Sequence, residues 1–223
     1  MGIVLLDLMG SPNVGAYILT TDSYIILPPI VPESKISRIK ETLNGEVVCT
    51  NVGGFSIIGA LAAANSNGVV LPHYTTDDEI KAIRSVVDIN VDRIECRMTA
   101  LGNLVLANDL GAIADARLLR EPGVAEEVED VLGVEVVPGE IAVLPYVGSL
   151  AVATNHGVLA HPMLKEEERE RLFEVLKVPI DVGTVNQGVP FVKSGLLVNS
   201  HGAIAGSLTT GPEIFIISNL FGL

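Results

Sequence analysis

Short apolar stretches that end in a few turn-forming residues and a glycine recur along this chain. Four of them align, and an apolar run of three residues follows each one; they occupy 59–68, 102–111, 148–157 and 193–202. A fifth stretch, 15–24, fits the same frame with Tyr24 in place of the closing glycine. The anchor positions 24, 68, 111, 157 and 202 are 43 to 46 residues apart. The pattern therefore predicts five sequential copies of one unit of about 45 residues.

Each copy is expected to begin with a β-hairpin. Asn67–Gly68, His156–Gly157 and His201–Gly202 stand at the predicted turns. We expect positive φ there, a backbone conformation that Asn, His and Gly tolerate better than most residues. Both histidines are thus interpreted as turn residues rather than metal ligands.

Helix signals follow the hairpins. Thr76, Asp77, Asp78 and Glu79 form a capping-box sequence, with Ile80 and Ile83 next in the helical pattern. Further helices are predicted from Ser34, from Pro122 and over 165–177, where the run of charges indicates a solvated face.

A last strand is predicted after four helices, at 46–52, 92–98, 134–141 and 179–185, so the unit is strand, strand, helix, strand. The fifth copy lacks that strand. Pro212 and Glu213 favour a helix over 213–221, although 214–217 could instead form a strand. The spare segment 3–8 completes the fifth unit if the ring closes, and closure removes an unpaired sheet edge. We expect one domain of five repeats, at 10–54, 55–99, 100–143, 144–188 and 189–223 with 1–9.

Composition fits a tightly packed aliphatic core. The 223 residues are 48% hydrophobic and include no Trp, so Val, Ile, Leu and Ala must fill the interior. The formal net charge of -13 argues against a protein that grips nucleic acid by its phosphates. Acidity suits a basic protein partner, although it could serve solubility alone.

Two cysteines, Cys49 and Cys96, are too few for a disulfide scaffold and lack metal-ligand spacing. Both lie in apolar runs, so we expect buried free thiols in a reducing compartment. Residues 1–9 carry Asp7 and no basic residue, unlike a signal peptide. No apolar run reaches the ~18 residues of a membrane span. We expect a cytoplasmic protein with no metal or other cofactor.

Several motifs resemble the translation initiation factor six family in its archaeal form. They are found at 67–72, 75–79, 100–103, 183–188 and 210–213, and the resemblance covers the whole chain. It implies an α/β fold of the pentein (α-β propeller) class, with five strand-strand-helix-strand repeats closed into a ring.

The resemblance also implies a ribosome anti-association factor. Such a factor binds the large (50S) ribosomal subunit, sterically prevents premature joining with the small (30S) subunit, and takes part in large-subunit biogenesis. The main partner would be a ribosomal protein near the sarcin–ricin loop, with minor rRNA contact at most. A closed ring without a spare edge favours a monomer.

A docking face at one end of the ring follows from the same resemblance. Carried over motif by motif, it comprises Ala60, Asn65, Asn103, Leu150 and Asn155, with Asn108 in the slot equivalent to Asn65. Turn capping is an alternative role for the asparagines at 65, 108 and 155. It explains Asn103 less well, because Asn103 follows Gly102 away from the turn; Asn103 is therefore the preferred contact residue.

Two other functions stay open at this point. Pentein enzymes that modify guanidino groups need a Cys nucleophile activated by a His, late in the chain. The fifth unit has no cysteine from Val189 onward, and its serines lack a nucleophile-elbow sequence, so catalysis is not expected. A ring that binds a protein outside the ribosome is the other alternative.

Overall fold

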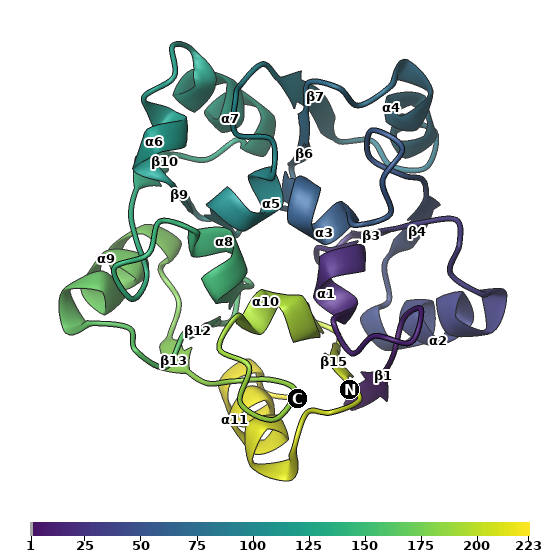
Figure 1. The fold of residues 1–223 in the computed structure, drawn as a ribbon, viewed down its shortest axis with the longest axis vertical. Coiled ribbons are helices and arrows are strands. Elements are labelled where there is room, and N and C mark those ends of the chain that lie inside the picture. Colours follow the sequence, from purple (N-terminus) through teal and green to yellow (C-terminus); the bar gives the residue numbers. More distant parts are fainter. Residues whose placement is uncertain (1) are drawn as a thin grey trace.

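Five three-stranded sheets stand around one axis in a computed structural model that describes residues 2–223 (Figure 1). Unit one has β2 (Leu19–Thr20), β3 (Tyr24–Leu27) and β4 (Glu46–Cys49); unit two has β5 (Ala63–Ala64), β6 (Gly68–Pro72) and β7 (Asn90–Ile94). Unit three has β8 (Val105–Ala107), β9 (Ala112–Ala114) and β10 (Val136–Pro138); unit four has β11 (Ala151–Ala153), β12 (Val158–Ala160) and β13 (Ile180–Val182). Unit five has β14 (Leu196–Val198), β15 (Ala203–Gly206) and β1 (Ile3–Leu6).

The strand order inside each unit is the same. The first two strands form an antiparallel hairpin, and the third strand pairs parallel to the middle one. In unit five that third strand is β1, which pairs with β15 from Ile3 opposite Ala203 to Leu6 opposite Gly206. The predicted closure of the ring by the N-terminal segment is confirmed.

The long helices form the rim of the ring, and short helices surround its centre (Figure 1). The rim helices are α2 (Glu33–Leu43), α4 (Asp77–Arg84), α7 (Val124–Leu132), α9 (Glu166–Leu176) and α11 (Gly211–Phe221), with the shorter α6 (Ala116–Leu119) beside α7. The central helices are α1 (Val14–Tyr17), α3 (Ile58–Leu61), α5 (Leu101–Leu104), α8 (Val147–Leu150) and α10 (Val192–Gly195). The helix predicted near 213–221 is confirmed, with Thr210 and Glu213 forming a capping box.

Rim helices bind successive units together. The helix α7 of unit three packs against β6 and β7 of unit two, so its Val124 and Val128 share one core cluster with Val70 of the neighbouring sheet. This α/β ring of five units is the pentein fold expected above.

One prediction about the first hairpin strand is wrong in its opening residues. The five stretches read as strands begin with four-residue helical turns, and the strand proper is only two or three residues long. In unit two, the Ala62 N–H bonds to Ile58 O at 2.9 Å and ends the helical turn before β5 begins. No polar capping side chain marks these turns, so the sequence pattern hid them.

The predicted positive φ at the hairpin glycines is also wrong. Positive φ occurs elsewhere, for example at Gly53 and Gly54, and not at Gly68 or Gly202. Glycine is needed at these hairpins because space is short. A Cβ on Gly68 would lie 2.2 Å from Val131 O of the next unit's helix, and one on Gly202 would lie 2.5 Å from Thr42 O.

Candidate functional site

The ring has two different ends, and the expected site residues are divided between them. The helical-turn end carries the central helices α1, α3, α5, α8 and α10. The hairpin end carries the turns that follow the first strand of each sheet. Ala60, Asn103 and Leu150 lie in α3, α5 and α8 at the helical-turn end. Asn65, Asn108 and Asn155 lie one strand-length away at the hairpin end, so the six do not form one patch.

At the helical-turn end, Ala60 and Asn103 are partly exposed, whereas Leu150 is 0% exposed and belongs to the core of unit four. Ala60 and Asn103 can therefore touch a partner on this end. Leu150 can act there only through the shape of the α8 turn.

At the hairpin end, Asn65 and Asn108 are 3% and 4% exposed because they join neighbouring units. Asn65 Nδ2 donates to Asn108 O at 3.1 Å and to Leu132 O at 2.8 Å. Asn108 Nδ2 donates in the same way to Thr154 O at 3.1 Å and Leu176 O at 2.8 Å. Their side-chain oxygens also accept local N–H groups, so the turn-capping interpretation holds and extends to the next unit.

Asn155 does not occupy the slot of Asn65. Thr154 stands three residues before Gly157 and takes that place, so Asn155 comes one position later. Its Nδ2 donates to Asp109 at 2.6 Å and to Asp22 of unit one at 2.9 Å. Units four and one are not neighbours in the ring, so this amide reaches across its axis. Residues of all five units line a small pocket there, which is the hairpin end of a central channel.

An apolar collar at the helical-turn end was not predicted from the sequence. Its members are large exposed side chains in the segments that lead into α1, α3, α8 and α10: Met9, Phe55, Ile57, Val143, Leu144, Tyr146 and Phe191. Phe55 is 56% exposed and Val143 is 54% exposed. The one available signal was an apolar residue directly beside turn formers, as in Gly53-Gly54-Phe55. Large apolar side chains that are exposed at one end of the ring make that end a candidate protein-binding surface.

Carboxylates at the rim hold the collar segments in place. Glu79 accepts from Gly53 N at 2.9 Å and Gly54 N at 2.8 Å, and Glu168 accepts from Ala142 N and Val143 N, each at 2.8 Å. Burial alone would raise the pKa of Glu79, but these backbone hydrogen bonds outweigh it and lower the pKa. The collar is thus carried on ordered loops.

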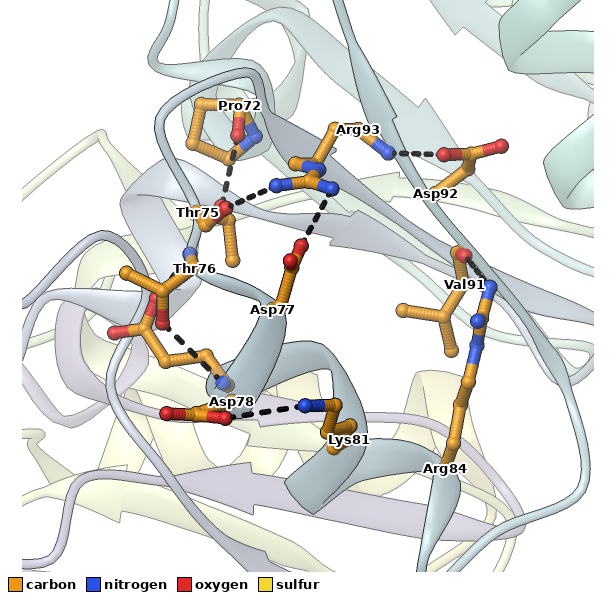
Figure 2. A network of polar contacts seen from close by, with 11 residues as sticks. Pro72, Thr75, Thr76, Asp77, Asp78, Lys81, Arg84, Val91, Asp92 and Arg93 are labelled. Carbon is orange, nitrogen blue, oxygen red and sulfur yellow. Dashed lines mark hydrogen bonds and ion pairs between the residues drawn. The ribbon is translucent and has the colours of Figure 1, made fainter.

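The rim helix that carries Glu79 is itself fixed to its sheet. Arg93 of β7 donates to Asp77 at the start of α4 at 2.7 Å and to Thr75 O at 3.0 Å, and both contacts are drawn in Figure 2. Arg84, at the end of α4, donates to Val91 O at 2.7 Å. Both ends of α4 are therefore bonded to strand β7. Because Glu79 of α4 binds Gly53 and Gly54, the Phe55 segment is held in a fixed position relative to the sheet.

A single arginine borders the collar between units three and four. Arg117 of α6 lies over the Tyr146 ring, 5.6 Å from its centroid, and bonds to the fully buried Asp115 at 2.7 Å. Burial would raise the pKa of Asp115, but the hydrogen bonds from Arg117 lower it overall. The guanidinium is thereby held in one orientation beside exposed apolar side chains, which is typical of interface arginines.

The two thiols differ, and the expectation that both are buried is wrong for Cys49. Cys96 is buried, whereas Cys49 is exposed on the outer strand β4. Burial and the nearby Glu33 raise the pKa of Cys49; burial and Glu121 raise that of Cys96 to about 11. Neither thiol is activated toward nucleophilic attack.

Within residues 2–223, no group of three His, Cys, Asp or Glu side chains could hold a metal ion. The helices of that same range include none that is both long and apolar enough to cross a lipid bilayer.

Comparison with known proteins gives a consistent result over the full sequence. The model of the eIF-6 family matches residues 3–220. The chain is 42% identical over 227 residues to a protein of Pyrococcus horikoshii named translation initiation factor 6, covering 100% of this chain and 99% of that one. A protein of the same name from Methanocaldococcus jannaschii is 40% identical over 220 residues, covering 96% and 95%.

Among solved structures, a Pseudomonas aeruginosa DDAH, mutated from Cys to Ser and complexed with citrulline, is 16% identical with a TM-score of 0.49. That match covers 76% of this chain and 68% of the other.

Proposed function

Since this chain belongs to the eIF-6 family, whose archaeal relatives are named translation initiation factor 6, we propose that it is a ribosome anti-association factor. It binds the large (50S) ribosomal subunit in the cytoplasm and prevents premature joining with the small (30S) subunit. It also takes part in large-subunit biogenesis. Membership of this family supports a role in translation initiation.

The apolar collar is the main observation in support of the location proposed for the docking face. A protein with a formal net charge of -13 exposes large apolar side chains in four of its five units at one end. Ala60 and Asn103 lie at that same end, inside the collar. We therefore place the docking face at the helical-turn end and do not extend it to the hairpin end.

The partner that fits this face is a ribosomal protein with an apolar and basic surface. We propose that it is the ribosomal protein expected near the sarcin–ricin loop. Desolvated aromatic and aliphatic anchors supply affinity, and the acidic surroundings steer a basic partner. Direct rRNA contact is minor, since an acidic surface repels phosphates. The factor acts as a monomer.

The mechanism is steric and needs no turnover. A ring whose sheets are joined by hydrogen bonds between units is a rigid body, and a rigid body bound at the joining face occupies the volume that the small subunit needs. The protein is not an enzyme in this proposal, a view supported by the raised pKa values of both thiols.

A sucrose gradient with purified 50S and 30S subunits tests the function. We expect the protein to co-migrate with free 50S subunits and to be absent from 70S ribosomes. Asn103→Arg and Phe55→Asp should each abolish most co-migration, whereas Phe215→Asp, on the exposed outer face of α11, should not. Co-migration with 70S ribosomes would contradict anti-association. A ring that binds a protein outside the ribosome would show no co-migration with any subunit.

A further inference from the structure

Lys193 occupies a position that is glycine in the other four units. The second residue of each central helix is Gly15, Gly59, Gly102 and Gly148 in units one to four, and Lys193 in unit five. A Cβ on any of these glycines would lie 1.9 to 2.3 Å from a backbone oxygen of the preceding turn. The junction between α8 and α10 is therefore the one place in this circle of turns that accommodates a side chain.

The Lys193 side chain crosses the mouth of the channel. Its Nζ donates to Gly102 O at 2.7 Å, which joins unit five to unit three, and these units are not neighbours in the ring. Gly102 is in the four-residue helix α5, whose last carbonyls lack helical partners. The bond thus satisfies a free carbonyl and fixes the turn that carries Asn103.

Lys193 has no carboxylate partner in the channel. A cavity of about 60 Å³ lies on the axis and is lined by residues of all five units, of which Lys193 is the only charged one. Asp22 and Asp109 line a separate, smaller pocket at the hairpin end. Burial lowers the pKa of Lys193 to about 8. An ammonium buried without a counter-charge costs stability, so its presence here calls for a functional reason.

We propose that Lys193 is a positioning residue for the docking face: it holds the α5 turn from across the channel, so that Asn103 meets the large subunit in its binding orientation. The inference rests on the proposed function. It adds to the collar a partly buried residue that acts through the backbone of Gly102.

The test is a double-mutant cycle with Lys193→Met and Asn103→Ala, in which the affinity of each variant for purified 50S subunits is measured. Met keeps the length of the side chain and removes the donor. We expect Lys193→Met to weaken binding about tenfold in the native background, and to have little further effect once Asn103 is Ala. Lys81→Met, which removes the same charge on the exposed rim helix α4, should bind normally.

A spectroscopic readout separates positioning from a loss of stability. The backbone amide signals of Gly102 and Asn103 should shift in Lys193→Met, while the melting temperature stays equal or rises because a buried charge is gone. Unchanged binding, or additive losses in the cycle, would overturn the proposal.

A titration of the native protein covers the case in which the variant does not fold. The Asn103 amide signal should titrate near pH 8; among the elements packed against α10, only α1 carries another ionisable side chain, Tyr17. A flat profile from pH 7 to 9 would count against the proposal. If the native protein does not bind 50S subunits at all, the proposed function fails, and these amide signals still decide whether Lys193 controls the Asn103 turn.

Discussion

Replacing Glu213 with Gln tests how strongly rim carboxylates hold the ring together. Glu213 is 6% exposed at the start of α11. It accepts hydrogen bonds from Gly188 N at 2.9 Å and from Thr210 N at 2.7 Å, and from the hydroxyls of Thr184 at 2.7 Å and Thr210 at 2.8 Å. Glu213→Gln keeps the size of the side chain and removes the charge that these donors stabilise.

The expected loss in the free energy of unfolding can be estimated from the pKa of Glu213. Burial alone would raise it, but the hydrogen bonds from Thr210, Thr184 and Gly188 outweigh burial and bring it from 4.5 to about 2. One pKa unit corresponds to about 1.4 kcal/mol, which sets an upper limit of about 3.4 kcal/mol. Since Gln retains an acceptor oxygen, we expect a loss of about 2 kcal/mol, within the range for hydrogen bonds to charged groups. For a chain of this size that lowers Tm by about 4–8 °C.

The assay is thermal unfolding followed by circular dichroism as the pH is lowered. A carboxylate with a depressed folded pKa contributes its stability above the unfolded pKa of 4.5, and loses it as pH falls toward 2. The difference in Tm between the native protein and Glu213→Gln should thus be largest at pH 7 and become smaller between pH 4.5 and 3. Glu167→Gln, an exposed residue in the first turn of α9, is the matched control and should change Tm little at any pH. A difference in Tm that is unchanged at pH 3, or no difference at pH 7, would refute the reasoning.

Three further outcomes follow from the contacts between units and from the two thiols. Gly102→Ala should lower the free energy of unfolding by about 1–3 kcal/mol in urea, because its Cβ would lie 2.2 Å from Gly59 O, whereas Gly211→Ala, with open space around it, should be harmless. Asn199 of unit five donates to Thr21 O at 2.9 Å and Leu43 O at 2.7 Å in unit one, as Asn65 and Asn108 do at their own unit boundaries. Asn199→Ala should therefore cost about 2 kcal/mol by the same measurement, and a loss under about 0.5 kcal/mol would show that these hydrogen bonds do not join the units. In mass spectrometry after iodoacetamide treatment, Cys49 should be alkylated before Cys96, both slowly at pH 7 and faster as pH rises, and rapid labelling at neutral pH would revive an enzymatic role.

Signals that lie within a few residues predicted the fold well. Pro212 and Glu213 marked the start of α11, and Thr76 with Glu79 marked the start of α4, because helix capping is a local matter. Closure by β1 followed from counting strands, since the fifth unit lacked one. These features depend on short-range chemistry or on the repeat itself.

Features that depend on the assembled ring could not be predicted from one unit. Gly68 is glycine because of Val131 O, which is far away in sequence, and the local explanation by positive φ was wrong. Asn108 looked like a turn residue, yet half of its side-chain hydrogen bonds reach unit four. The exposure of Phe55 likewise depends on what the folded ring leaves uncovered, which the sequence pattern does not contain.

The pairing of β1 with β15 sets the timing of folding during synthesis. Ala203, the partner of Ile3, is added 200 residues later, and at about 5–20 residues per second the first strand waits roughly 10–40 s for its neighbour. Units one to four can form their sheets in order as they emerge, whereas β1 stays an open edge throughout that period. The growing polypeptide is therefore most vulnerable to mispairing at its first strand, and the ring closes only after β15 has been synthesised.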